Sequence, residues 1–328
     1  MEAEIKQVEA HLADLGGEVE AAKKRLAALR MELSQMVSRQ VDSLSAVSTP
    51  GDRVPATNAE KLALFRSLFR GREDVFPRRW ENTRKGTAGY SPACAHEWQP
   101  GLCAKQGGRS KGKKATCGEC PNQAFIPLSD VEVAKHLRGE QVIGVYPLLP
   151  DETCWFLAAD FDKGTWQEDM AAFVETCAHH GVPVAVERSR SGQGGHAWFF
   201  FSTPVAATSA RRLGCYLLTE TMDRRPQLSL ESYDRLFPNQ DTLPRGGLGN
   251  LIALPLQREA RDAGNSVFLD GAFQPWPDQW AFLAGVERIE PARVQSLAEE
   301  ARRRGQVIGV RTGEGADGFD REPWTRPP

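Results

Sequence analysis

Residues 155–162 read WFLAADFD, and residues 182–201 read VPVAVERSRSGQGGHAWFFF; these two segments predict the core of the fold. The apolar run of the first segment predicts a buried strand that ends on two acids, Asp160 and Asp162. Residues two apart in a strand point to the same face, so the two carboxylates project together and Phe161 points away. Two like charges this close need a cation between them, and a hard divalent ion such as Mg²⁺ or Mn²⁺ prefers carboxylate oxygens.

A polar, glycine-rich turn separates two further predicted strands. Thr165–His180 has helical periodicity with Gly181 at its expected C-cap, and Val182–Val186 and Ala197–Phe201 then predict strands. The turn between them offers backbone N–H groups, guanidinium groups, hydroxyls and an imidazole, which suit phosphate oxygens. Metal-binding acids beside such a turn indicate a nucleoside triphosphate, or another phosphoryl group, as the ligand. The candidate phosphate-binding residues are Arg188, Arg190, Ser191, Gly192, Gly194 and His196.

The order of these motifs resembles a known family. AADFD at 158–162, followed by SRSGQGGHAWFF at 189–200, is similar to motifs I and II of the archaeo-eukaryotic primase superfamily, an acid pair and an S-x-H-type motif. The likeness covers roughly residues 60–290 and is greatest to the primase-polymerase modules of TOTE conflict systems, with CRISPR-associated primase-polymerases more distant. It implies a nucleotidyltransferase, a template-directed DNA primase-polymerase that transfers nucleotides to a 3′-hydroxyl. De novo primer synthesis stays open.

The resemblance also implies a third acid. A two-metal polymerase site typically holds its ions with about three carboxylates. In the superfamily the third follows an apolar residue on a later strand, and SYDRLFPNQD at 232–241 resembles that motif. Asp234 fits it best, with Asp241 and Glu231 as alternatives. The catalytic acids implied are Asp160, Asp162 and Asp234, holding two Mg²⁺ or Mn²⁺ ions, while Ser191, the glycine turn and His196 grip the triphosphate.

The implied fold class is α/β (α+β), a primase catalytic core with a mainly antiparallel sheet of RNA-recognition-motif type. A second α/β unit with a zinc knuckle packs beside this core, and the catalytic groups lie in the cleft between them. The predicted domains are a coiled-coil helix over 1–40, a linker over 41–58, a basic N-terminal part of the primase module with the zinc knuckle over 59–128, the catalytic core over 129–305, and a flexible tail or linker over 306–328.

The first forty residues carry a separate pattern. Their apolar residues recur at alternating spacings of three and four, from Ile5 to Met36, which is the heptad seam of a coiled coil. Gly16 and Gly17 interrupt the seam, and each costs about 1 kcal/mol inside a helix. The seam predicts self-association, most simply as a dimer, or docking to a partner helix. A long helix packed on its own chain is the alternative.

Residues 61–120 are locally basic, although the whole chain has a net charge of −2. Thirteen Lys or Arg residues stand against five acids, a local net charge of +8. This mixture of cations and aromatic rings suits a nucleic-acid backbone with stacking platforms, DNA template–primer or RNA. A solvated basic face over core aromatics is the alternative. The interleaved aromatic residues are Phe65, Phe69, Phe76, Trp80, Tyr90 and Trp98.

Four of the seven cysteines lie in the same basic block. A pair separated by two residues, Cys117-Gly-Glu-Cys120, is typical of a zinc knuckle, and Cys94 and Cys103 form a second, wider pair. Four thiolates around Zn²⁺ make a closed structural site, with His96 as a possible substitute ligand. The intervening loop is too polar to fold unaided, so the metal would organise it. Free structural thiols are the alternative.

The composition, with 41% hydrophobic and 26% charged residues, is that of an ordinary globular protein. Neither a signal peptide nor a membrane-spanning run is present, which predicts a cytoplasmic location. His136 is predicted to lie on a helix surface without a role. TOTE proteins continue into helicase and nuclease modules, so such modules are possible fusion partners.

Two other classes of function stay open. DFDKGT at 160–165 resembles the D-x-D-G-T signature of haloacid dehalogenase-type phosphatases, although Lys163 interrupts it. A non-catalytic zinc-ribbon adaptor that binds nucleic acid is the other alternative.

Overall fold

The computed structural model describes residues 25, 54–103, 105, 117–225, 230–243 and 246–305. The chain divides into two compact units, residues 1–52 and 53–328. Apart from Arg25, the predicted coiled coil lies outside the described residues, as do most of the predicted linker and the predicted tail after residue 305. The domain boundaries therefore stay predictions, and the fold described below is that of the second unit.

The central sheet is antiparallel and has the strand order β7-β4-β6-β5-β9. Helix α4 connects β4 to β5, and helix α5 connects β6 to β7. Strands β4 to β7 and the two helices thus follow a β-α-β-β-α-β order along the chain, and β4 and β6 are the two central strands of these four. This is the ferredoxin-like arrangement that RNA-recognition motifs share. The mixed α/β fold with a mainly antiparallel sheet is confirmed. The elements are β4 (Thr153–Asp162), α4 (Trp166–His179), β5 (Ala185–Arg188), β6 (Gly194–Ala206), α5 (Ala207–Arg224), β7 (Tyr233–Phe237) and β9 (Val267–Leu269).

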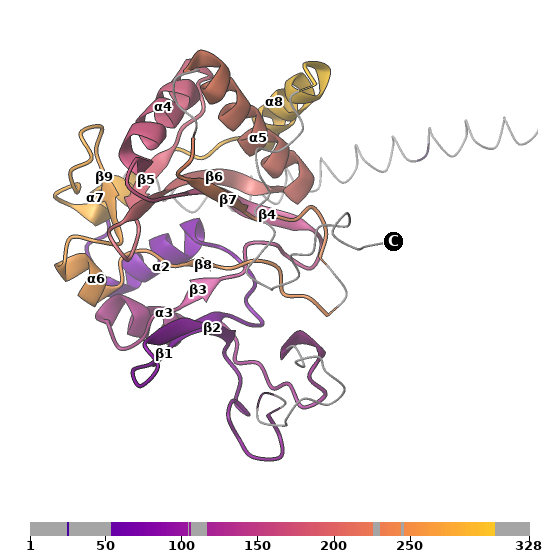
Figure 1. Ribbon diagram of the computed structural model, residues 1–328, viewed down its shortest axis with the longest axis vertical. Helices are drawn as coiled ribbons and strands as arrows, with labels where there is room; N and C mark the ends of the chain where they lie inside the picture. The colour runs from indigo at the N-terminus through magenta and orange to yellow at the C-terminus, as the bar shows by residue number, and fades with distance from the viewer. Residues whose placement is uncertain are drawn as a thin grey trace, which may run out of the picture. The chain divides into compact units, whose positions relative to one another are not determined.

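The two faces of this sheet have different coverings (Figure 1). Helices α4 and α5 cover the face that carries Phe161, whose ring centroid lies 5.4 Å from that of Phe173 on α4. The opposite face carries Trp198. The ring of Phe69 packs edge-on against this indole, with the two ring centroids 5.1 Å apart. Asp160 belongs to this second face, because side chains alternate along β4. The acids therefore lie on the face against which the rest of the unit packs.

That remaining part contains two small antiparallel sheets, β1-β2 and β3-β8. β8 returns from the C-terminal side of the chain to pair with β3, and Ile143 beside β3 forms a bridge to Arg78 on β1. Helix α2 starts after its N-cap, Thr57, which makes a capping box with Glu60. The elements of this part are α2 (Asn58–Leu68), β1 (Pro77–Asn82), β2 (Thr87–Pro92), η1 (Cys117–Glu119), α3 (Asp130–Arg138), β3 (Gly144–Val145), β8 (Ile252–Ala253), α6 (Arg258–Asp262) and α7 (Gln279–Ala284). The last helix, α8 (Pro291–Arg303), lies instead beside α5 (Figure 1).

His136 is fully buried, so the prediction that it lies on a helix surface is wrong. Its Nε2 lies 3.0 Å from the carbonyl oxygen of Pro255, and its Nδ1 accepts from the Ile143 N–H at 3.2 Å. A carbonyl only accepts and an N–H only donates, so the ring is the neutral tautomer with its proton on Nε2. Burial lowers the pKa of His136 to about 4. The side chain thus joins α3 to the residue before β3 and to the segment that follows β8.

Within the described part of the chain, no helix is long and apolar enough to cross a membrane.

Candidate active site

The structure brings three carboxylates together at the end of the central sheet. One oxygen from each of Asp160, Asp162 and Asp234 lies within 4.8 Å of the others. Asp160 and Asp162 are alternate residues of β4 and project from the same face, as their spacing predicts, while Phe161 between them is fully buried. Asp160 is largely buried and Asp162 is exposed. This set of hard oxygen donors fits a divalent cation.

A β-bulge places Asp234 in this group. Asp160 pairs with Arg235 across β4 and β7, but the next residue, Phe161, pairs with Tyr233. Asp234 is therefore the extra residue in β7. In an unbroken register it would oppose Phe161 and point to the helix-covered face. A bulge re-aims a side chain, and here the carboxylate of Asp234 turns toward the other two acids.

The two alternatives for the third acid lie elsewhere. Asp241 is ion-paired to Arg211 at 2.5 Å, and Glu231 is exposed before β7. Neither joins the acidic group among the described residues. Asp234 itself accepts from Arg235 Nε at 2.7 Å, which leaves its second oxygen for other partners.

Four charged side chains form a transverse row across the sheet. Cross-strand pairing sets Arg235 opposite Asp160, Asp160 opposite His196, and His196 opposite Glu187. Side chains directly opposite one another share a face, so positive and negative groups alternate along this row. His196 Nε2 lies 3.5 Å from Asp160 Oδ1, and His196 Nδ1 lies 2.9 Å from Glu187 Oε2.

Burial and, to a smaller extent, the negative charges of Asp162 and Asp234 raise the pKa of Asp160 to about 6, against the opposing effects of His196 and Arg235. For His196, burial opposes the charged imidazole, but Glu187 and the two β4 acids outweigh it and raise the pKa to about 9. The row therefore holds His196 as a cation, and the acidic group gains stability from any bound divalent charge.

Glu187 is the buried support of this row. Only 2% of the residue is exposed, and its Oε2 accepts hydrogen bonds from both His196 and the indole N–H of Trp198, the latter at 2.8 Å. Its Oε1 accepts from Ser266 at 3.4 Å. A buried carboxylate with three donors fixes the orientation of the imidazole.

A second buried carboxylate supports the acids themselves. Asp169 on α4 accepts the Ser232 hydroxyl at 2.5 Å and the Ser232 N–H at 3.3 Å. The carbonyl oxygen of Ser232 accepts from the backbone N–H of Asp162 at 2.6 Å. Ser232 thus ties the start of β7, which carries Asp234, to the end of β4.

The glycine-rich turn lies against the acids. Gly194 pairs with Asp162, and a Cβ at Gly194 would lie 2.4 Å from Asp162 Oδ1, so only glycine fits. Gly192 has a φ of 78°, the left-handed region that glycine favours. Ser191 Oγ accepts from the Gln193 N–H at 3.3 Å and lies 3.1 Å from Ser189 Oγ. The turn is pinned by its own hydroxyls beside the acidic group.

The two arginines of the turn differ in their partners. Arg188 donates to the carbonyl oxygens of Gly264 and Phe273 at 2.9 and 3.0 Å, so its guanidinium holds neighbouring loops. Its role in nucleotide binding stays a prediction. Arg190 lies near Tyr90 on β2. Burial raises the pKa of Tyr90, while the positive charges of Arg190 and Arg79 oppose the rise. Arg190 thus reaches the β1-β2 sheet.

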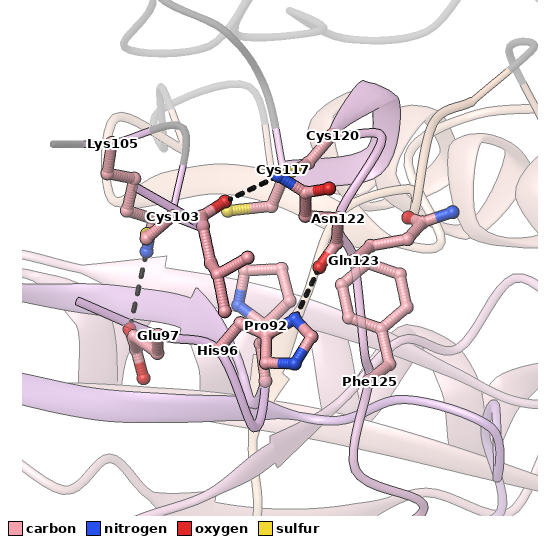
Figure 2. A pocket seen from close by; sticks show the side chains of 12 residues that line it. Pro92, His96, Glu97, Cys103, Lys105, Cys117, Cys120, Asn122, Gln123 and Phe125 are labelled. Carbon is pink, nitrogen blue, oxygen red and sulfur yellow. Dashed lines mark hydrogen bonds and ion pairs between the residues drawn. The ribbon is translucent and has the colours of Figure 1, made fainter. Parts of the chain in front are cut away.

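The four predicted zinc ligands line one pocket. Cys94, Cys103, Cys117 and Cys120 line this pocket together with His96. Figure 2 shows His96 beside Asn122, whose carbonyl oxygen lies 2.8 Å from Nδ1. Cys94 Sγ accepts a hydrogen bond from the Ala124 N–H at 3.4 Å. Among the described residues no three of these ligand atoms approach one another as closely as the three aspartates do.

Several residues of the site were missed by reasoning from sequence: Glu187, Asp169, Ser232 and Arg235. Glu187 and Arg235 are each next to a predicted motif, and a cross-strand pairing diagram would have found them. Asp169 gives no such signal, because an acid in the first turn of a helix is ordinary at a surface.

The family of the chain follows from a sequence comparison. The family described as "TOTE conflict system, Archaeo-Eukaryotic Primase domain" matches residues 60–297, close to the resemblance expected over 60–290. An antiparallel sheet that gathers three acids beside a glycine turn, within this match, defines a nucleotidyltransferase of the primase-polymerase class. The chain belongs to the archaeo-eukaryotic primase domain family of TOTE conflict systems.

Two solved structures were found to be similar. The polymerase domain of Mycobacterium tuberculosis ligase D in complex with DNA has 14% identity and a TM-score of 0.34, covering 78% of this chain and 94% of that chain. The AEP domain of the cyanophage S-2L primase-polymerase has 14% identity and a TM-score of 0.32, covering 74% of this chain and 100% of that chain. A comparison with curated proteins found no match.

Proposed function

We propose that this chain is a template-directed DNA primase-polymerase that transfers nucleotides from nucleoside triphosphates to a 3′-hydroxyl. The observation that carries the proposal is the acidic group of Asp160, Asp162 and Asp234, whose oxygens lie within 4.8 Å of one another. Membership of the primase domain family supports the reaction class.

The acidic group fits two divalent cations, Mg²⁺ or Mn²⁺. Its donors are all carboxylate oxygens, and Asp160 is held close to two other acids in a largely buried position, which a bound cation relieves. Bound divalent ions in such sites lower the pKa of the attacking hydroxyl and neutralise charge on the transferring phosphates.

The remaining residues bind and orient the substrate. His196 presents Nε2 on the same face as the acids, where its N–H can donate to a phosphate oxygen. Ser191 and the backbone N–H groups of the turn come just before His196 in the sequence. Gly194, between them, lies directly against Asp162. Arg190 adds a cation at the side of the turn that faces Tyr90. Together they would hold a triphosphate with its reacting phosphate near the acids.

The pocket lined by four cysteines supports a second proposal, a structural Zn²⁺. Cys94, Cys103, Cys117 and Cys120 converge on one cavity from three separate chain segments, and tetrahedral thiolate coordination is the usual chemistry for such a set. His96 Nδ1 faces a carbonyl oxygen, so the neutral ring carries its proton there and leaves Nε2 with a lone pair. His96 is thus a credible alternative ligand.

A labelled-primer extension assay separates the three candidate functions. A primase-polymerase lengthens the primer according to the template, a phosphatase releases phosphate from small esters, and an adaptor binds DNA but does neither. We expect templated extension that requires Mg²⁺ or Mn²⁺. Phosphate release from a small ester without any extension would overturn the proposal, as would DNA binding without any extension.

A further inference from the structure

The tip of the β1-β2 hairpin borders an open hollow. It is lined by residues 80–85, Thr87 and Trp98, and we call it the hairpin hollow. It belongs to the small sheets and not to the acidic group on the central sheet.

Two indole rings in the hairpin hollow are exposed, in contrast to the phenylalanines of the basic block. Phe65, Phe69 and Phe76 are at most 3% exposed and belong to the core, whereas Trp80 is 38% and Trp98 52% exposed. Large exposed aromatic side chains that line a common surface are typical of recognition sites. The alternative of a solvated basic face over core aromatics therefore applies to the phenylalanines and not to these two tryptophans.

Local contacts hold both rings in place. Trp80 lies against its cross-strand partner Gly89, where a Cβ would come within 2.8 Å of the indole. Trp98 has a φ of 61°, an uncommon conformation for a bulky residue, and the Lys105 ammonium lies 5.1 Å from its ring centroid. Residues held in sparsely populated conformations cluster at binding sites.

The charge of the hollow is complementary to phosphate. Most other arginines of the basic block are committed: Arg66 pairs with Glu73 and Asp130, and Arg78 pairs with Glu97. At the hairpin tip, Arg84 and Lys85 have no ion pair within the part of the chain that the structure describes. The one acid of the hollow, Glu81, is paired with Arg79. Two uncommitted cations therefore lie beside two exposed indoles.

We propose that the hairpin hollow binds an unpaired nucleic-acid strand, with bases stacked on Trp80 and Trp98 and phosphates contacted by Arg84 and Lys85. The class of ligand rests on the proposed function, since a polymerase of this kind works on a template with a single-stranded part. In a duplex the base faces are already stacked, so exposed indoles favour an unpaired strand. Stacking tolerates any base, so the site is not sequence-specific.

Binding of the full chain to fluorescein-labelled oligothymidylate and to a blunt duplex of equal length tests the proposal, without nucleotide or divalent metal. We expect Trp80→Ala and Trp98→Ala each to weaken binding of the single strand by about tenfold, with little effect on the duplex, because each stacked base is worth about 1–3 kcal/mol. Trp98→Phe should keep most of the affinity. Lys85→Gln should reduce the salt dependence of binding.

Trp276→Ala is the matched control, since Trp276 is 40% exposed but lies before α7, outside the hollow. Circular dichroism checks folding, and if Trp80→Ala unfolds because its ring packs on Gly89, Trp98→Ala decides. Single-strand affinity that is unchanged in Trp98→Ala, or reduced equally in Trp276→Ala, overturns the inference. If the hollow variants lose single-strand binding but the wild-type protein extends no primer, the proposed function is wrong and this inference stands.

Discussion

Asp160 and His196 are direct cross-strand partners on β4 and β6, with Nε2 of the imidazole 3.5 Å from Oδ1 of the carboxylate. This pairing fixes the spatial relation between the acid motif and the turn motif, since both lie on neighbouring strands in one register. Continuing the row to Glu187 and Arg235 gives each buried charge an opposite neighbour. Buried charges are tolerated when they are paired in this way.

Glu187 is expected to act as a positioning residue for His196. Glu187→Gln keeps hydrogen-bond acceptors for the imidazole and indole, whereas Glu187→Leu removes them. We expect the nucleotide KM to rise about tenfold in the Gln variant and further in the Leu variant, because outer-shell partners of this kind typically contribute 10–100-fold. Steady-state kinetics with primer–template and nucleotide varied separately measure this.

A merely structural role for Glu187 would lower kcat and the fraction of folded protein without changing the nucleotide KM more than the primer KM. Ser266→Ala removes only the outermost hydrogen bond, at 3.4 Å, and is the control. Equal nucleotide KM values for the Gln, Leu and wild-type proteins would contradict the positioning role.

Ser232 is expected to stabilise the folded protein beside the acidic group. Ser232→Ala deletes the hydroxyl that donates to the buried Asp169 at 2.5 Å, which leaves that carboxylate underpaired. The free energy of unfolding should fall by about 1–3 kcal/mol, the usual cost of an unsatisfied buried acceptor. Urea denaturation measures it. Ser209→Ala, at an exposed hydrogen bond on α5, should stay within about 0.5 kcal/mol of wild type; a similar value for Ser232→Ala would refute the prediction.

The burial of His136 as a neutral ring is expected to make the stability of the protein depend on pH. Its pKa is about 4 in the folded protein and about 6.5 when exposed, so below pH 6.5 the unfolded chain takes up a proton that the folded chain excludes. The free energy of unfolding should therefore fall as the pH drops from about 6.5 to 4, by up to about 3 kcal/mol. Above pH 6.5 the ring is neutral in both states and contributes no slope.

The difference between wild type and His136→Gln isolates this contribution, because a glutamine amide can donate to Pro255 and accept from Ile143 without titrating. Urea unfolding at a series of pH values, without divalent ions, gives the difference curve. Parallel curves for the two proteins across this pH range would contradict the assignment.

The cysteine pocket is expected to hold one Zn²⁺ per chain. Elemental analysis of purified protein should give one zinc, and Cys117→Ser should lose it and loosen the surrounding loop without unfolding the central sheet. Cys177→Ser is the control, since Cys177 is fully buried on α4. Zinc-free wild-type protein with Cys94, Cys103, Cys117 and Cys120 all freely reactive would count against the site.

Local patterns were enough to predict the parts of the site that lie on single strands. The alternation of Asp160, Phe161 and Asp162 along one strand gives the shared face of the two acids directly. The antiparallel sheet came from the family resemblance and not from periodicity. Sequence spacing does not report register between strands, so it gave no reason to expect the bulge that turns Asp234 inward.

Long-range partners account for what could not be predicted. Arg188 looked equivalent to Arg190 in the turn, but it bonds carbonyl oxygens 76 and 85 residues away in the sequence. His136 looked like a surface residue because its partner Pro255 is 119 residues away. Both outcomes depend on how loops pack, which no local window contains.

Primer extension by Asp234→Asn, compared with Glu231→Gln, tests the central claim most directly. Both acids lie near the start of β7, but only Asp234 belongs to the acidic group. We expect Asp234→Asn to abolish templated incorporation with Mg²⁺ or Mn²⁺ while its melting temperature stays equal or rises, because one of three repelling charges is removed. Glu231→Gln should extend primers like wild type. Wild-type extension by folded Asp234→Asn would contradict the assignment of the active site.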